Sequence, residues 1–500
     1  MRQKARDGGY DAFSDADALA AEIDALESEA ARLRVALHAL TWSESEGLYF
    51  DRPGGPEVSQ CGNAWAIIAG VAGPRETARI FQRFPLDAKL APGSFFCWHF
   101  IFTALVRAGL YDRMGSIPTA QLRRIAYIWC VVAGTLFLAY LARQLRQGMT
   151  DGADHPFGED FLNFWSGAHL AVTGQAGIIY DLAAFHAFET GIAGAPIDLY
   201  HYSYPPVMWL ISAPFGLLPY PLAWAAWQLL GWGALALAVR QLAPVQWVLV
   251  ALAAPAVFIN AMGGQNGCWT AAIIGWGLIL LRDRPAVAGM ILALFVVKPQ
   301  LGWLIPLTLL AGRQYRALGA FIGTALALAL ITLPLFGFDA WIAYVQQGSL
   351  LKSVILEHGD GTWHRMLSIF VLVRHVGAQI PLAYAAQAIA SLTVALLVLR
   401  VWHREGPTVR AKALLVLGVL AGSLYVSDYD CVMALLAVLW LWPQATAGLR
   451  GRMALLLAMP LFAAPLALMS GVALGALALW PALLGAGLQR APYLAGDGLR

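Results

Sequence analysis

Residues 125–143 read IAYIWCVVAGTLFLAYLAR, and this stretch decides the class of fold. It contains no acidic residue, and its single charged residue is the terminal Arg143. About 20 such residues form one helix across the hydrocarbon core of a bilayer. Nine more apolar runs follow, so we predict about ten membrane crossings. The predicted crossings are residues 125–143, 220–240, 245–262, 267–281, 316–336, 380–400, 411–427, 431–444, 453–470 and 473–488.

A shorter apolar pair, residues 285–297 and 301–312, is interrupted by Lys298-Pro299. Proline removes a backbone donor and breaks a helix, so this pair predicts two half-helices. The predicted fold is all-α: a polytopic membrane protein with about ten transmembrane helices and one broken helix pair.

The composition excludes a soluble single domain. The 500 residues are 59% hydrophobic and 13% charged, about half the charge of an ordinary globular protein. Residues 1–120 hold 27 of the 63 charged residues, so a water-soluble segment precedes the membrane part. The net charge of +3 is spread between apolar runs, which gives nucleic-acid binding no support. Five cysteines without metal-ligand spacing predict neither a metal site nor a disulfide framework.

The amino-terminal segment, residues 1–115, reads as a short soluble helical fragment. It has no apolar stretch in its first 30 residues that could act as a signal peptide, so we expect its start to remain cytoplasmic. Apolar residues at helical spacing predict an amphipathic helix from Asp15 to about Leu40, capped near Ser14. Two further apolar stretches, 64–71 and 95–108, complete a helical-hairpin pattern.

Lys and Arg gather on one side of the ten-crossing topology, except for Arg143 and Arg146, which follow the first crossing and are expected at the membrane interface. Because cytoplasmic loops retain Lys and Arg, we expect a multi-pass protein of the cell inner (plasma) membrane with both termini cytoplasmic. The opposite side receives the loops 144–219 and 337–379 and the short turns GGQNG and SDYD. These four segments form the candidate site.

The membrane part resembles the family-87 glycosyltransferases, polytopic enzymes of the GT-C class. The resemblance covers about residues 120–490 and rests on the order of its motifs. These are GEDFLNFW and a G…IYD helix end after the first crossing, a YPP motif, the GGQNG turn, the RP-x-x-AG step, the Lys-Pro break, TWHRMLSIF and LYVSDYD. The family includes polyprenol-phosphate-mannose-dependent mannosyltransferases.

The resemblance implies transfer of a sugar, with mannose as first candidate, from a polyprenyl-phosphate donor to a lipid or glycan acceptor hydroxyl. Asp160 matches the family's catalytic aspartate and would be the base, with adjacent Glu159 as the fallback. The alternative is that Asp160 only caps a helix, since Asp is a favoured N-cap residue. We expect no cofactor. No DxD motif is flanked by the Rossmann-like alternation of a nucleotide-sugar enzyme, and no ATP-binding G-x-x-x-x-G-K-[ST] loop is present, so a soluble nucleotide donor is not expected.

The remaining candidates are polar residues in or next to apolar sequence, and each has a structural alternative. Lys298 could bind a lipid phosphate, or it could extend to the membrane interface. His364 and Arg365 could contact the sugar or phosphate, or be solvated loop residues. Gln265 and Asn266 could bind sugar hydroxyls or only form their turn. Tyr204 could stack on a sugar or belong to an interfacial aromatic belt. Asp428 and Asp430 require a partner cation or a functional role.

Two other hypotheses concern the amino-terminal segment and an alternative function of the chain. Residues 15–114 resemble hairpins of the (α/α)6 domain of bacterial α-L-rhamnosidases, through WSESEGLYFD, SQCGNAWAIIAGVAGPRE and LAPGSFFCWHFIFTALVRAGLYDRM. This partial toroid would be inactive, whether a fusion remnant, a misjoined gene start or a regulatory cap. The main alternative function is a multi-span secondary transporter, against which the absence of an obvious repeat argues.

Overall fold

The computed structural model describes residues 16–55, 57–83, 119–243, 248–359 and 362–488, and nearly all their regular structure is helical. The chain divides into two compact units, residues 1–119 and 120–500.

Unit 1 contains helices and one small β-hairpin. Its elements are α2 (Ala16–Thr41), β1 (Trp42–Ser43), β2 (Leu48–Tyr49), α3 (Gln60–Ile68) and α4 (Pro74–Arg83). The two strands are antiparallel, with Trp42 opposite Tyr49. The sequence predicted α2 and α3 but missed this hairpin, since a strand of two residues leaves no alternating pattern. The third expected helical stretch, 95–108, lies outside the described residues.

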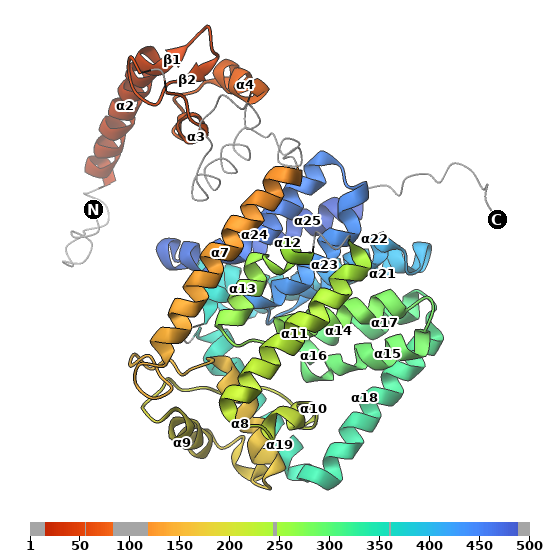
Figure 1. Cartoon of the computed structure of the whole chain (residues 1–500). Helices are drawn as coiled ribbons and strands as arrows, with labels where there is room; N and C mark the ends of the chain where they lie inside the picture. The colour runs from red at the N-terminus through yellow and green to blue at the C-terminus, as the bar shows by residue number, and fades with distance from the viewer. Residues whose placement is uncertain (1–15, 56, 84–118, 244–247, 360–361, 489–500) are drawn as a thin grey trace. The chain divides into compact units, whose positions relative to one another are not determined.

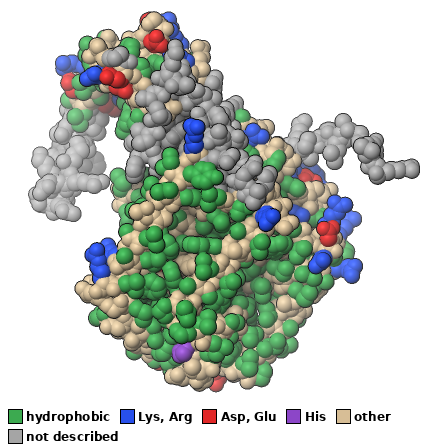
Figure 2. All heavy atoms as spheres, viewed as in Figure 1, with side chains coloured by type: hydrophobic (Ala, Val, Ile, Leu, Met, Phe, Trp, Pro, Cys, Tyr) green, Lys and Arg blue, Asp and Glu red, His purple; other side chains and the backbone are tan. Residues whose placement is uncertain are grey.

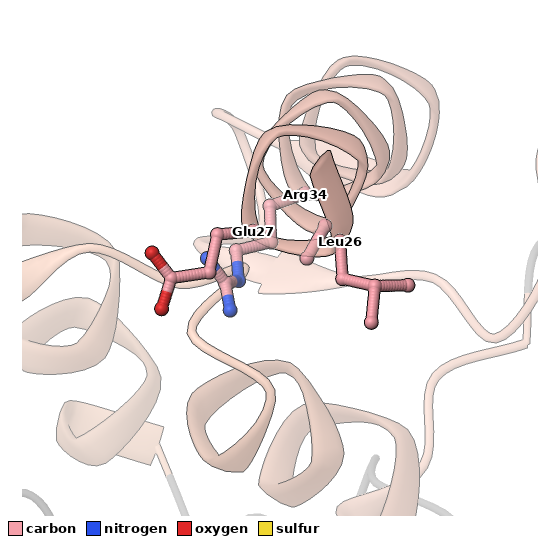
Figure 3. Close-up of a pocket in the computed structure, with 4 residues that line it drawn as sticks. Leu26, Glu27 and Arg34 are labelled. Atoms are coloured by element: carbon pink, nitrogen blue, oxygen red, sulfur yellow. The ribbon is translucent and has the colours of Figure 1, made fainter. Parts of the chain in front are cut away.

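The described surface of unit 1 includes a hollow on α2 lined by Leu26, Glu27, Ala30 and Arg34 (Figure 3). Arg34 is fixed there by a hydrogen bond of 2.9 Å from Nε to the carbonyl oxygen of Ala69. None of the residues that the sequence analysis singled out as catalytic or substrate-binding lies in this hollow.

Unit 2 contains five helices that are long and apolar enough to cross a membrane (Figure 1). Figure 2 shows hydrophobic side chains over most of the visible face of this unit, as expected for a surface in contact with lipid. The long apolar segments are Tyr127–Gln144 of α7 (Thr119–Gln144), α11 (Tyr220–Leu242), α18 (Tyr315–Phe336), α21 (Ile380–Glu405) and α24 (Ala447–Ser470).

Five of the ten predicted crossings form these long helices, and the other five predicted runs form shorter helices. Residues 248–262 are split into α12 (Val248–Leu252) and α13 (Pro255–Met262), with Pro255 beginning the second. The other four runs form α14 (Gly267–Leu280), α22 (Val409–Gly422), α23 (Val432–Leu441) and α25 (Ala476–Leu488). Nearly every residue of α22 and α23 is buried within the protein. A buried core helix and a lipid-facing helix are equally apolar, so the sequence alone could not separate them.

The predicted break at Lys298-Pro299 is present. α15 (Pro285–Ala293) tightens into the 3₁₀ turn η3 (Leu294–Val297), and α16 (Pro299–Gly302) and α17 (Leu304–Ala311) follow the break. Lys298 leaves helical geometry, with φ −131° and ψ 69°. The break therefore projects a lysine from between two apolar helices.

The two long predicted loops are built from short helices, of which α8, α9, α10 and α19 lie at one end of unit 2 (Figure 1). The first loop contains α8 (Asp160–Val172), η1 (Ala176–Ile178), α9 (Leu182–Ala193) and α10 (Val207–Gly216). The second contains α19 (Phe338–Leu351), the π-helix η4 (Lys352–Glu357), η5 (Trp363–Arg365) and α20 (Ile369–His375). The SDYD turn forms η6 (Asp428–Cys431), and η7 (Trp442–Gln444) follows α23.

Candidate functional site

The candidate base, Asp160, begins helix α8 directly after a sharp turn. The two residues before it, Gly158 and Glu159, have φ angles of 81° and 50°, and positive φ is uncommon for a residue other than glycine. Glu159 is the N-cap residue and makes no side-chain capping bond. The carboxylate of Asp160 accepts a hydrogen bond from Nε2 of Gln265. Asp160 is thus the first residue of the helix, not its N-cap.

A glycine contact brings Gln265 to Asp160. Gly264 has φ +59°, and a Cβ built on it would lie 2.0 Å from the carbonyl oxygen of Gly158 and 2.8 Å from Cβ of Phe161. Only glycine fits at such an approach. The GGQNG turn therefore packs directly on the turn before α8, and residues 105 positions apart in the chain meet there.

The side-chain amides of the GGQNG turn have unused hydrogen-bonding capacity. Nδ2 of Asn266 donates to the hydroxyl of Tyr204 at 3.2 Å. Within the described part of the chain, Oε1 of Gln265 and Oδ1 of Asn266 are buried without a hydrogen-bond partner. A buried acceptor left unpaired costs about 1–3 kcal/mol, so these two oxygens can bind a donor such as a sugar hydroxyl.

The acidic turn η6 holds two cations. Nζ of Lys298 lies 2.8 Å from Oδ1 of Asp430, and both side chains are almost fully buried. Arg365 donates to Asp428 through both Nε and Nη2 at 3.1 Å, a bidentate pair. The ring of Tyr429 lies between the pairs, 4.7 Å from the Lys298 ammonium and 5.8 Å from the Arg365 guanidinium.

These pairs answer two questions that the sequence left open. Lys298 is only 2% exposed and bound to Asp430, so it does not extend to a membrane interface. Asp428 and Asp430, for which a partner cation or a functional role was expected, are paired with the cations Arg365 and Lys298.

Backbone pairing joins the second long loop to the acidic turn. Met366 forms an isolated antiparallel bridge with Ser427, and the amide of Leu367 donates to the carbonyl of Val426 at 2.9 Å. The capping box of η6 also fixes Asp430, whose Oδ2 accepts from the amide of Ser427 at 3.0 Å. The backbone therefore determines where both ion pairs lie.

The charges of Arg365 and Lys298 act on Asp160, which places Asp160 and both cations in one electrostatic site. Burial raises the pKa of the Asp160 carboxyl, although Arg365 and the hydrogen bond from Gln265 oppose this shift. Burial and the neighbouring charge of Arg365 lower the pKa of the His364 imidazole, which is therefore neutral near pH 7. His364 lies in η5 with Arg365, in the same site.

The structure also shows a hydrogen-bond network around Glu159 that the sequence did not indicate. Its carboxyl group accepts from the hydroxyl of Tyr140, from Nε2 of Gln144 at 3.1 Å and from the hydroxyl of Tyr200 at 2.9 Å. Burial and the charge of Asp160 raise the pKa of Glu159 to about 7. Tyr140 and Gln144 lie in the last turns of the apolar segment of α7, 19 and 15 residues before Glu159. No short sequence motif indicates that they contact this acid.

No group of three His, Cys, Asp or Glu side chains in the described ranges is placed to hold a metal ion. The charged groups of the site include the three aspartates and the two cations described above, with the carboxyl group of Glu159 beside Asp160. Such a set can accept a proton and stabilise an anion.

Residues 202–428 match the family model of glycosyltransferase family 87, so this part of the chain is a family-87 glycosyltransferase domain. The matched range includes Tyr204, the GGQNG turn, Lys298, the His364-Arg365 pair and Asp428, but neither Asp160 nor Asp430. No curated protein and no solved structure matches the chain. Nothing in the comparisons supports the rhamnosidase resemblance of residues 15–114. The small β-hairpin of unit 1 was not expected from that resemblance, which predicted helical hairpins.

Proposed function

We propose that this protein transfers a sugar from a polyprenyl phosphate to an acceptor hydroxyl at the extracytoplasmic face of the cell membrane. Mannose is the first candidate for the sugar, and a lipid or a glycan for the acceptor. Catalysis would lie within residues 120–490, without a contribution from residues 1–115. The observation that carries this proposal is the meeting of Asp160 with two buried or partly buried cations in a chain containing a family-87 domain.

The cations suit a departing phosphate. Lys298 has three N–H donors and gives one to Asp430, while Arg365 has five and gives two to Asp428. The remaining donors can bind phosphate oxygens. In the absence of donor substrate, the two aspartates compensate charges that would be expensive to bury alone.

The reaction would proceed by a single displacement. Asp160 takes the proton of the acceptor hydroxyl, and the hydroxyl oxygen forms a bond to the anomeric carbon of the sugar. The bond from that carbon to the phosphate oxygen breaks, and its electron pair leaves with the polyprenyl phosphate. Lys298 and Arg365 stabilise the charge on the leaving phosphate. Attack opposite to the leaving group inverts the anomeric centre.

The neutral side chains of the site would orient the sugar. The unpaired amide oxygens of Gln265 and Asn266 can accept hydrogen bonds from sugar hydroxyls. Neutral His364 can donate or accept one, and the ring of Tyr204 offers an apolar face for stacking.

A transfer assay with the full chain in membranes tests this proposal. Radiolabelled polyprenyl-phosphate mannose and glucose are supplied to membranes containing wild type or Asp160→Asn. The exposed Asp339→Asn serves as the control for loss of a carboxylate. The expected result is labelled product with wild type and the control, and little or none with Asp160→Asn. Sugar uptake into vesicles without transfer would instead support a transporter.

A further inference from the structure

Helix α9 carries a buried carboxyl group that the proposed reaction does not use. Glu189 is 0% exposed, and within the described residues neither of its carboxyl oxygens has a hydrogen-bond partner. It lies on the buried face of α9, one turn from Phe185 and one turn from Ala193. Burying a polar group without a partner costs several kcal/mol. A ligand that supplies the missing hydrogen bonds would recover this cost.

The neighbouring helix α8 carries two more unsatisfied buried groups. The ring of Phe188 on α9 lies 6.1 Å from that of His169 and 6.4 Å from that of Trp165, which shows that the two helices pack together. On α8, Nδ2 of Asn163 and Oγ of Ser166 are buried and lack partners among the described residues. On α9, Nδ1 of His186 and Oγ1 of Thr190 are also buried without partners among the described residues. Native proteins leave few such groups unsatisfied, so five residues of this kind on one helix pair require an explanation.

The chemistry of these groups fits hydroxyls better than ions. Burial and the charge of Asp160 raise the pKa of Glu189 well above its usual range, which favours the protonated carboxyl group. A protonated carboxyl group and the Ser166 hydroxyl can each donate and accept, and the Asn163 amide nitrogen donates. A hydroxyl group also donates and accepts, whereas a metal cation or a phosphate can satisfy only one of these needs.

The position of the groups relative to Asp160 indicates which substrate they contact. Asn163 and Ser166 lie three and six residues beyond Asp160, about 4.5 Å and 9 Å along the axis of α8. The cations that suit the donor phosphate are held by η6 instead. An acceptor with one hydroxyl at Asp160 can therefore extend along α8.

We propose that α8 and α9 form a subsite for the hydroxyl groups of the acceptor, with Glu189 as a specificity-determining residue. The acceptor would then carry a sugar or another polyol next to the hydroxyl that reacts. The assignment to the acceptor rests on the proposed function, whereas binding of a polyol by these helices does not.

Binding of simple glycosides to the purified full chain, in the absence of any donor, tests the subsite. The probes are the methyl α-glycosides of mannose, glucose and galactose, and the readout is the change in melting temperature with concentration. Glu189→Gln retains one donor and one acceptor, so its apparent Kd should stay within about threefold of wild type. Glu189→Leu fills the space but removes both functions, and should weaken binding by about tenfold or more.

Two further variants keep the test decisive. Ser166→Ala should weaken binding as well, even if Glu189→Leu fails to fold. Glu357→Leu is the control, since its carboxylate pairs with Lys352 and Tyr384 instead. Wild type that binds none of the three glycosides would overturn the subsite, and so would equal binding by wild type and the Glu189→Leu and Ser166→Ala variants. Glycoside binding that depends on Glu189, without transfer from any polyprenyl-phosphate sugar, would retain the subsite and reject the proposed function.

Discussion

At the scale of single residues, the site depends on charges that compensate one another inside an apolar protein. Lys298, Asp430, Arg365 and Asp428 form two pairs, and the charges of both cations act on Asp160. Removing one member of a buried pair is more damaging than removing both, because it leaves an uncompensated charge. This asymmetry allows the structural role of a cation to be separated from its role in binding.

Lys298→Met should therefore be compared with the double variant Lys298→Met/Asp430→Asn. The single variant leaves Asp430 buried without its cation and should lose about 3–5 kcal/mol of stability. The double variant should recover much of that stability while its KM for the lipid donor stays about tenfold or more above wild type, since a phosphate contact is missing. Melting temperature and donor KM are the two measurements. A double variant with wild-type donor KM would show that Lys298 has only a structural role.

The raised pKa of Glu159 predicts how the stability of the folded protein depends on pH. Its pKa is about 7 in the folded protein and about 4.5 in the unfolded chain, so the folded state holds its proton more tightly. Stability from this group is fully present below about pH 4.5 and is lost as pH rises to about 7, by about 3 kcal/mol in total. The melting temperature of wild type should fall across this range more than that of Glu159→Gln. Parallel curves for the two proteins would contradict this pKa.

At the scale of elements, tight contacts between turns assemble the site. Gly264→Ala would place a methyl group 2.0 Å from the carbonyl oxygen of Gly158 and strain a residue with φ +59°. We expect a loss of about 1–3 kcal/mol of stability and a lower kcat, because Gln265 moves away from Asp160. Gly233→Ala in α11 is the control, since nothing lies within 4 Å of its added Cβ. Equal activity of the two variants would show that the turn does not position the base.

The sequence predicted individual segments of the site better than their pairing. Lys298-Pro299 marked a helix break because proline cannot continue the ladder, and SDYD required cations because it adjoins apolar sequence. No local sequence pattern could predict that Arg365 pairs with Asp428, 63 residues away. Nor could one predict that Glu189 is buried without a hydrogen-bond partner among the described residues. The sequence could not show which apolar runs face lipid, because α22 and α23 are as apolar as the long helices but are buried within the protein. Tertiary packing decides all of these features.

At the scale of the whole molecule, the proposed orientation of the long helices in the membrane predicts which loops are accessible from outside the cell. Helix α21 (Ile380–Glu405) is about 39 Å long, follows the 337–379 loop and includes the first five residues of the 401–410 segment. In a chain without its native cysteines, a cysteine at Val376 should react with an impermeant reagent in intact cells, and one at Arg404 should not. Both positions should react after permeabilisation. Labelling of both in intact cells would contradict the assigned topology and the extracytoplasmic site.

The central claim is that Asp160 is the base of a transfer from a polyprenyl phosphate, and the kinetics of Asp160→Asn test it most directly. A general base contributes mainly in the transition state, so its loss lowers kcat more than it changes donor binding. We predict that Asp160→Asn lowers kcat by about 10² or more, while the Kd for the polyprenyl-phosphate sugar stays within about threefold of wild type. Wild-type turnover by Asp160→Asn would contradict the claim and direct the search for the base to Glu159 or the SDYD turn.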